Sequence, residues 1–241
     1  MPGRVVQSAR MLAASSPDSD SPRQSMTALR PGLFLTFEGP EGAGKTTQIG
    51  LLEAVLKQAG FAVTRTREPG GDTVGERVRD LLLHGAVGPQ AELLLFAAAR
   101  AQNVQTVVLP ALEAGQIVLC DRFTDSTLAY QGAGRGLDAV FIREVNRFAT
   151  GGLVPDRTFL LDLPPADGLA RQMREEQNRL DREALTFHER VRATFLQIAT
   201  SEPERVVVVN ASRSMNLVAA ELQTSVFALL ETRQVARTDA A

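Results

Sequence analysis

The segment Gly39-Pro40-Glu41-Gly42-Ala43-Gly44-Lys45-Thr46 decides how this chain folds. It has the residue spacing of a phosphate-binding P-loop, in which glycines let backbone N–H groups turn inward around phosphate oxygens. The lysine is expected to reach the β- and γ-phosphates of a nucleoside triphosphate, and the Thr46 hydroxyl to ligate Mg²⁺. Lys45 is one of only two lysines in the chain, so its place in the motif does not reflect abundance.

The residues on either side supply the context that this motif requires. Leu33–Glu38 is a continuous apolar run typical of a buried strand, and Thr47–Gln58 has helical spacing and ends near Gly60. A P-loop binds phosphate between a strand and the N-terminus of a helix, where the helix dipole favours negative charge. We therefore expect residues 39–46 to bind a nucleoside triphosphate.

Short apolar runs alternate with helical stretches along the rest of the chain. Continuous apolar strands separated by helices predict an α/β fold with a five-stranded parallel sheet and helices on both faces. Ligands are then expected at the carboxyl ends of the strands. The other expected strands are Phe61–Thr66, Gln116–Cys120, Thr158–Leu163 and Val206–Val209, and the other expected helices are Val74–Leu83, Gln90–Glu113, Leu137–Phe148, Asp167–Thr200 and Met215–Thr232.

Composition narrows the class of protein. Residues 1–30 are rich in Ser, Pro, Ala and Asp and are expected to be a disordered extension, followed by one domain over residues 31–241. The net charge of −2 argues against broad binding to nucleic acid, and no stretch approaches the roughly 20 apolar residues of a membrane span. The single cysteine, Cys120, cannot form a disulfide within the chain. A soluble cytoplasmic protein is expected.

Two further motifs follow the second and third expected strands. Asp121-Arg122 resembles the acidic strand end that holds Mg²⁺, with an arginine able to bridge two phosphates; the alternative is a plain strand-end ion pair. Thr66-Arg67-Glu68-Pro69-Gly70-Gly71 either brings backbone close to a ligand or is a simple loop. Arg79, on the next helix, either binds a phosphate or faces solvent.

A third pair of residues has the chemistry of nucleobase recognition. Phe96 and Arg100 stand four residues apart on one helical face, so that both can address one ligand. A core phenylalanine and a surface arginine are the alternative. The charged stretch over about residues 166–184 reads either as a lid that closes over a phosphoryl group or as a salt-bridged exposed helix. His84 and His188 lack metal-ligand spacing, so no site is assigned to them.

These motifs, in this order, resemble the thymidylate kinase family, which phosphorylates dTMP to dTDP with ATP and has the nucleoside monophosphate kinase variant of the P-loop NTPase fold. The resemblance runs from about Leu33 to the C-terminal helix. It is carried by the segments 37–47, 67–71, 96–102 and 121–132 in register.

The resemblance implies a role for most of the polar residues in these segments. Phe96 would stack on thymine and Arg100 would bind its O4, while Thr127 and Gln131 contact the base and Ser126 and Tyr130 line the pocket. The dTMP phosphate would be held by Arg79 and Arg122, with Glu68 near it and near Mg²⁺, and Asp121 would position both metal and arginine. Glu41 would address the sugar 3′-hydroxyl.

The resemblance also bears on the lid and on assembly. The P-loop has no arginine at its variable positions, which is the bacterial layout in which basic lid residues reach the γ-phosphate; Arg174 and Arg179 are the candidates here. The chain departs from the family in being shorter between Asp181 and Phe187. A homodimer is implied, with the apolar residues of Val74–Leu83 and Gln90–Leu109 able to supply either an interface or a core.

Two other functions remain open from the sequence. Another P-loop kinase with a different acceptor, such as a deoxynucleoside, would share the fold and differ only at the base site. A P-loop NTPase switch would hydrolyse its nucleotide without an acceptor and would lack a base pocket formed by Phe96 and Arg100.

Overall fold

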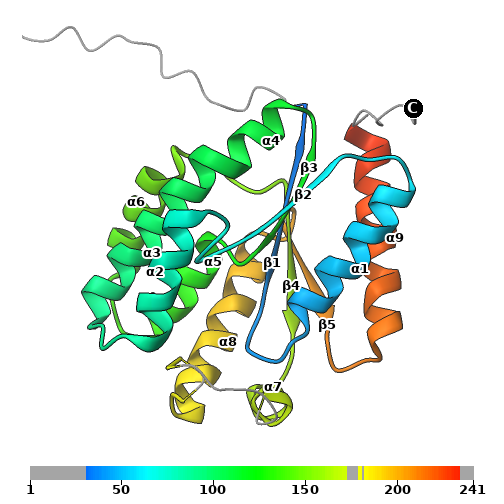
Figure 1. Cartoon of the computed structure of the whole chain (residues 1–241). Coiled ribbons are helices and arrows are strands. Elements are labelled where there is room, and N and C mark those ends of the chain that lie inside the picture. Colours follow the sequence, from blue (N-terminus) through cyan, green and yellow to red (C-terminus); the bar gives the residue numbers. More distant parts are fainter. Residues whose placement is uncertain (1–30, 173–178, 181, 234–241) are drawn as a thin grey trace, which may run out of the picture.

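The computed structural model describes residues 31–172, 179–180 and 182–233 (Figure 1). The expected disordered extension, residues 1–30, lies outside the described residues. So do residues 173–178, 181 and 234–241.

A five-stranded, fully parallel sheet forms the centre of the described chain, in the order β2-β3-β1-β4-β5. The strand that precedes the P-loop, β1, is the middle strand and pairs with β3 on one side and β4 on the other. Its central position explains its continuous apolar sequence, since both of its faces are covered. The strands are β1 (Leu33–Glu38), β2 (Val63–Arg67), β3 (Ile117–Asp121), β4 (Arg157–Asp162) and β5 (Val206–Asn210).

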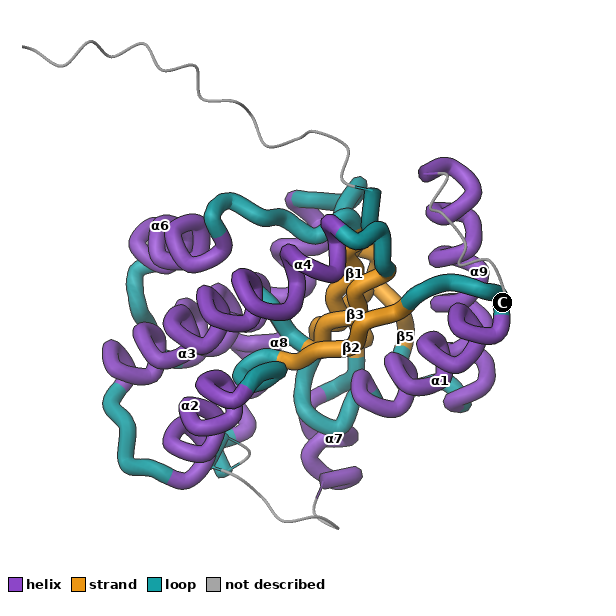
Figure 2. Tube along the Cα trace, turned by 45° about the horizontal axis from the view of Figure 1, so that its top comes forward, coloured by secondary structure: helices purple, strands orange, loops and turns teal. Residues whose placement is uncertain are grey.

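Helices cover both faces of the sheet, as Figure 2 shows. On one face α1 and α9 pack against Leu33, Leu35 and Phe37 of β1, whereas Phe34 points to the opposite face and packs with residues of η1 and α4. This alternation is the two-residue period of a strand. The helices are α1 (Lys45–Gln58), α2 (Thr73–His84), α3 (Pro89–Asn103), η1 (Val104–Val108), α4 (Leu109–Glu113), α5 (Thr124–Thr127), η2 (Leu128–Gly134), α6 (Ala139–Thr150), α7 (Pro165–Gln172), α8 (Leu185–Ser201) and α9 (Met215–Arg233).

The fold class is confirmed, and each expected strand lies within two residues of an observed one. The expected helix over Gln90–Glu113 is interrupted by η1, a stretch of wider π-helical turns. Pro110 gives a physical reason, because it lacks the N–H that would bond to the carbonyl of Thr106 in an α-helix.

One expectation about a helix was wrong. A continuous helix over Asp167–Thr200 is not formed: α7 is described over Pro165–Gln172, residues 179, 180 and 182–184 are not helical, and α8 begins only at Leu185. Between them, the backbone N–H of Arg179 donates to the carbonyl of Leu83, a tertiary contact that a helix would not allow. The structure also contains α5 and η2 over residues 124–134, where the sequence has no apolar period that would predict a helix.

The buried carboxylate of Glu38, at the end of β1, holds the start of α5. Its Oε1 accepts hydrogen bonds from the backbone N–H groups of Phe123 (2.8 Å) and Ser126 (3.2 Å), and its Oε2 lies 2.5 Å from the Ser126 hydroxyl. Burial raises the pKa of Glu38 to about 7, with Asp125 adding to the effect and the bonds to Ser126 and Phe123 opposing it.

This raised pKa makes a prediction about stability. Because folded Glu38 binds its proton more tightly than unfolded Glu38, its contribution to the free energy of unfolding falls as pH rises from about 4.5 to about 7. At about 1.4 kcal/mol per unit of pKa, the loss is about 3 kcal/mol. Relative to Glu38→Gln, the wild type should lose this much stability in denaturant unfolding across that pH range.

The exposed Glu113, at the end of α4, provides a matched control for this measurement. Glu113→Gln should leave the pH dependence of unfolding as it is in the wild type. Parallel curves for wild type and Glu38→Gln would contradict the assignment of the buried proton to Glu38.

Candidate active site

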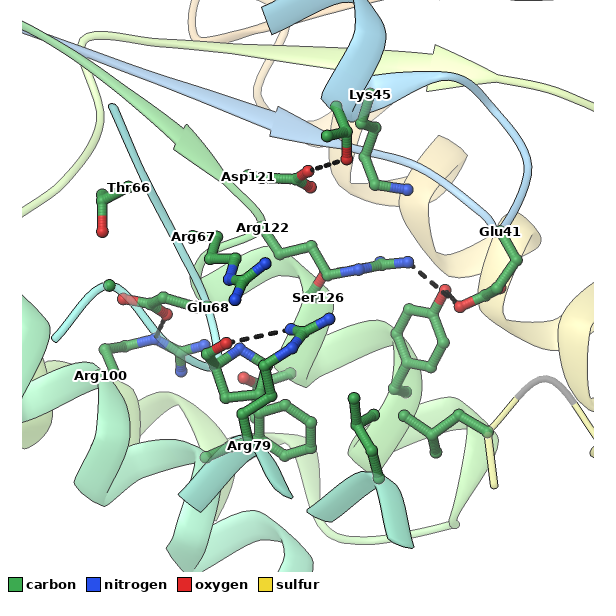
Figure 3. A pocket seen from close by; sticks show the side chains of 18 of the residues that line it. Glu41, Lys45, Thr66, Arg67, Glu68, Arg79, Arg100, Asp121, Arg122 and Ser126 are labelled. Atoms are coloured by element: carbon green, nitrogen blue, oxygen red, sulfur yellow. Dashed lines mark hydrogen bonds and ion pairs between the residues drawn. The ribbon is translucent and has the colours of Figure 1, made fainter. Parts of the chain in front are cut away.

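A cavity of about 750 Å³ opens at the carboxyl ends of β1, β2 and β3, where ligands bind in open parallel sheets (Figure 3). Its size suits small organic ligands. The P-loop, the loop after β2, one side of α3 and the segment 121–131 contribute its walls. Of the residues predicted from the sequence, those that line it are Glu41, Gly42, Gly44, Lys45, Thr46, Glu68, Arg79, Phe96, Arg100, Asp121, Arg122, Ser126, Thr127, Tyr130 and Gln131.

The P-loop wraps around the ammonium group of Lys45. Gly39, Gly42 and Gly44 all have positive φ, which glycine adopts without strain. The Lys45 Nζ donates to the carbonyls of Gly39 and Pro40, both at 2.9 Å. Burial and the nearby Arg122 lower the pKa of Lys45 to about 8, against the pull of surrounding carboxylates. The lysine is therefore held at the start of α1, where phosphate oxygens are favoured.

Thr46 and Asp121 meet at the junction of α1 and β3. The Thr46 hydroxyl donates to Asp121 Oδ2 at 2.7 Å, so two of the three residues predicted at the magnesium site lie together. An oxygen pair of this kind suits Mg²⁺, which keeps several waters and commonly binds one or two carboxylates plus phosphate oxygens. Among the described residues no cluster of three His, Cys, Asp or Glu side chains could hold a metal without such help.

Arg122 connects the loop after β3 to the P-loop. Its backbone has φ of 69°, a left-handed conformation that is uncommon outside glycine and occurs at functional sites. The guanidinium donates to Gly39 O (3.1 Å), Ser126 Oγ (3.2 Å) and Glu41 Oε1 (3.1 Å). It also lies 4.9 Å from the centre of the Tyr130 ring. These contacts aim the cation into the middle of the cavity.

Glu41 is held from three sides. The Tyr130 hydroxyl donates to its Oε1 at 2.5 Å, Arg122 pairs with the same oxygen, and His188 Nδ1 lies 3.3 Å from its Oε2. Burial acts to raise the pKa of Glu41, but His188, Arg122, Lys45 and Tyr130 together hold it at about 2. Glu41 is thus a carboxylate under all ordinary conditions. His188, to which the sequence assigned no site, supports it from α8.

Glu68 and Arg100 form a buried ion pair on the opposite wall, with Arg100 Nε 2.7 Å from Glu68 Oε2. Asn103 donates to the other carboxylate oxygen at 3.2 Å. Arg100 also donates to Asn146 Oδ1 (2.6 Å) and to the carbonyl of Phe123 (3.0 Å). Three of its five N–H groups are used, which leaves one on each terminal nitrogen for a ligand.

The cavity is also lined by arginines to which the sequence analysis assigned no individual site role. Arg79 donates to the carbonyl of Pro69 at 3.1 Å, beside Arg67, which pairs with Glu76. Arg65 and Arg171 also line the cavity, and Arg171 donates to the carbonyl of Gly42 at 3.2 Å. A cluster of arginines around one cavity indicates an anionic ligand. In the sequence, only the positive charges of Arg65, Arg67 and Arg171 could have suggested that they belong to this site.

The two lid arginines predicted to reach the γ-phosphate are not both placed. Arg174 lies outside the described residues. Arg179 is not among the residues that line the cavity; its guanidinium pairs with Glu92 at 2.5 Å and donates to the carbonyl of Leu82. Of the arginines described in the predicted lid, Arg171 contacts the P-loop, through the carbonyl of Gly42.

Gly168 explains how α7 approaches the P-loop so closely. A Cβ on Gly168 would lie 2.1 Å from the carbonyl oxygen of Glu41, and a Cβ on Gly42 would lie 2.2 Å from that of Gly168. The two backbones therefore meet without side chains between them, and this contact brings Arg171 over the loop.

The far end of the cavity has the character of a base pocket. Phe96 is half-buried on α3, and Ser126, Thr127 and Gln131 lie across from it on α5 and η2. The Thr127 hydroxyl is buried and, within the described residues, has no hydrogen-bond partner. A buried hydroxyl without a partner is costly, so a ligand that completes its hydrogen bond is favoured there.

The cavity therefore has two different ends joined by cations. Lys45, Thr46 and Asp121 at one end suit a metal-bound triphosphate, while Phe96 and the polar groups opposite it suit a base, with Arg79 and Arg122 between them. A fold and site of this kind define a nucleoside monophosphate kinase of the P-loop class.

Comparison with known proteins narrows the class to one family. The thymidylate kinase family profile matches residues 37–222. The chain is 54% identical over 198 residues to a thymidylate kinase of Deinococcus radiodurans, covering 81% of this chain and 96% of that one. It is 56% identical over 191 residues to one from Synechococcus sp. (strain JA-2-3B'a(2-13)), covering 79% and 92%.

A solved structure agrees with these relatives. The crystal structure of thymidylate kinase from Ehrlichia chaffeensis superposes with a TM-score of 0.68 at 35% identity, covering 81% of this chain and 98% of that one. This chain belongs to the thymidylate kinase family. No helix in the described part of the chain is both long and apolar enough to cross a membrane.

Removal of the unpartnered Thr127 hydroxyl is expected to affect the stability of the protein and its binding of the acceptor differently. Thr127→Val removes a buried polar atom and nearly keeps the side-chain volume, so the free protein should melt at the same temperature or higher. Binding of the acceptor nucleotide should weaken by about tenfold, the value of one lost hydrogen bond. Calorimetric melting and titration of the same samples measure the two effects.

Thr150→Val, at a buried threonine on α6 outside the lining of the cavity, is the matched control and should leave acceptor binding unchanged. A Thr127→Val variant that melts lower and binds its acceptor as tightly as the wild type would show that the hydroxyl serves the fold.

Proposed function

We propose that this chain transfers the γ-phosphoryl group of ATP to dTMP, giving ADP and dTDP, a step in the synthesis of dTTP. Membership of the thymidylate kinase family supports the reaction. The observation that carries it is the position of Arg122, whose guanidinium lies between the P-loop and the base pocket and contacts both Gly39 and Ser126. One cation can thereby serve donor and acceptor.

The donor end is proposed to hold ATP with Mg²⁺. The P-loop residues 39–46 would surround the β- and γ-phosphates through backbone N–H groups and Lys45. Thr46 and Asp121 would hold Mg²⁺, which when bound offsets phosphate charge. Glu68 suits this role less well than the sequence suggested, because both of its oxygens already accept hydrogen bonds from Arg100 and Asn103.

The acceptor end is proposed to hold dTMP. Phe96 would stack on the thymine ring, with the free N–H groups of Arg100 directed to O4 and with Thr127 and Gln131 on the remaining edge. Ser126 and Tyr130 would complete the pocket wall. Arg79 and Arg122 would hold the 5′-phosphate, and Glu41 would accept a hydrogen bond from the sugar 3′-hydroxyl.

The chemistry needs alignment and positive charge more than proton transfer. An oxygen of the dTMP phosphate attacks the γ-phosphorus, and the bond from that phosphorus to the bridging oxygen of ADP breaks. The attacking oxygen is largely ionised at neutral pH, so the chain need supply no general base. Lys45 and Arg122 would stabilise the charge that spreads over the transferring group.

The lid is proposed to supply a further cation to the γ-phosphate. Arg171 is favoured by its contact with the carbonyl of Gly42. Arg179 would have to leave Glu92 first, and Arg174 keeps the role that the family resemblance implies. An arginine supplied to a transferring phosphoryl group is worth about 10³ to 10⁵ in rate in P-loop enzymes.

The proposed reaction is tested with a panel of acceptors. ATP with dTMP, dUMP, dCMP, dAMP or thymidine should give the highest kcat/KM for dTMP, measured by ADP release. Lys45→Ala and Arg122→Ala should lose activity by at least about a thousandfold with every acceptor. Faster transfer to thymidine than to dTMP, or ATP hydrolysis unaffected by any acceptor, would rule the proposal out.

Phe96→Ala serves as the specificity control in this panel. It should raise the KM for dTMP far more than it changes kcat, because it removes stacking from the acceptor and leaves the phosphate end intact.

We further propose a cytoplasmic homodimer, as the resemblance to the thymidylate kinase family implies. Large exposed apolar side chains support an interface on α6 and its neighbour α3: Leu94, Val140, Phe141 and Phe148, the last of them 88% exposed. Sedimentation equilibrium should show a dimer for the wild type and for Leu217→Ser on α9. Phe148→Glu should be largely monomeric, and a Phe148→Glu dimer of unchanged affinity would refute this interface.

A further inference from the structure

Glu92, on α3, is a fully buried carboxylate that the proposed reaction does not use. Three side chains converge on it from other parts of the chain. Gln131 Nε2 donates to its Oε1 at 2.7 Å, Arg135 contacts both oxygens at 3.2 and 3.3 Å, and Arg179 Nη2 lies 2.5 Å from Oε2. Only Gln131 among these four residues lines the cavity.

The surroundings of Glu92 keep it ionised. Burial acts to raise the pKa of this carboxyl, but the hydrogen bonds from Gln131, Arg135 and Arg179 outweigh burial and hold the pKa below its ordinary value. An ionised carboxylate has only acceptor atoms. Whatever contacts it must therefore donate.

This restriction fixes the orientation of the Gln131 amide. A glutamine side chain has a donor end and an acceptor end, and a free amide can present either to a ligand. Here the NH₂ group must face Glu92, so the carbonyl oxygen Oε1 is directed away from Glu92, on the side of the amide left for the cavity. Thr127 cannot set a polarity in the same way, because its hydroxyl both donates and accepts.

We propose that Glu92 is a positioning residue that makes the base pocket accept a pyrimidine with an N–H at ring position 3 and oppose one with a lone pair there. The proposal rests on the proposed function, in which Gln131 faces the base. Thymine has such an N–H, and cytosine has a lone pair in its place. With cytosine, the acceptor Oε1 of Gln131 would face the acceptor nitrogen at ring position 3. Oε1 would then be buried without a hydrogen-bond donor, which costs more than a missing contact.

The experiment compares dTMP with 5-methyl-dCMP, which keeps the methyl group and the ring shape. The measured quantity is the ratio of their kcat/KM values. Arg100 also discriminates between these two acceptors, through its proposed contact at ring position 4. This contribution is the same in the wild type and in variants at Glu92, so it cancels when their ratios are compared.

Glu92→Gln lets the Gln131 amide turn, because the new amide can donate to it as well as accept from it. The ratio should fall by about tenfold from its wild-type value. Arg179→Met is the matched control: it removes an ion pair from Glu92 but leaves the bond to Gln131. Rates with both acceptors can change in this variant, but their ratio should stay within about threefold of the wild type.

The exchange variant Glu92→Gln with Gln131→Glu restores the arrangement with the partners reversed. Residue 131 is then an acceptor at both ends, and the amide at residue 92 donates to it. The ratio should return to within about threefold of the wild type, even where absolute rates fall. This variant also carries the test if Glu92→Gln alone fails to fold, as judged by circular dichroism and melting.

An unchanged ratio in Glu92→Gln, an equal fall in Arg179→Met, or a lost ratio in the exchange variant would each overturn the role of Glu92. A wild type that does not prefer dTMP to 5-methyl-dCMP would instead overturn the proposed function. The two failures are thus distinguishable.

Discussion

Repulsion between cations gathered at one end of the sheet is the constraint on which the rest of the site depends. Lys45, Arg67, Arg79, Arg100 and Arg122 line one cavity because the proposed ligands carry many negative charges. In the free protein each of these cations donates to a carboxylate or to a backbone carbonyl. The acidic residues of the site therefore act mainly as partners of these cations. Glu41 and Glu68 hold arginines in place, and only the pair of Asp121 with a hydroxyl offers metal-binding oxygens that no cation occupies in the contacts described.

The topology of the sheet makes this gathering possible. Since β1 lies between β3 and β4, the P-loop and the Asp121-Arg122 turn are neighbours in space although about 80 residues separate Glu41 from Arg122 along the chain. Glu38 then ties the start of α5 to the end of β1, which sets where Ser126 and Thr127 face. In the proposed function, the base pocket thus depends on a buried carboxylate one residue before the P-loop, and the proposed base and phosphate sites share one strand end.

The sequence predicted the parts of this structure that depend on local pattern. The P-loop and the five strands follow from apolar periods and from a motif with a known mechanism. Other residues lining the cavity, namely Ser126, Thr127, Tyr130 and Gln131, were assigned to the site only through the family resemblance. The break between α7 and α8 could not be predicted, because helical composition there is overridden by contacts of Arg179 with Leu82, Leu83 and Glu92, distant in the chain. His188 was missed for the same reason: its importance comes from Glu41, which lies 147 positions earlier, and a lone histidine on a helix gives no signal of its own.

The contact between Gly42 and Gly168 has a consequence for how this sequence can change in evolution. Each glycine leaves room for the backbone of the other, so an alanine at either position forces the phosphate loop and the lid helix apart. A compensating change at the partner position does not exist, because neither residue has a side chain that could be made smaller. A substitution at either site therefore disrupts this contact, and a second substitution at the other site does not restore it. In this chain the close contact between α7 and the P-loop is therefore kept only while both positions are glycine.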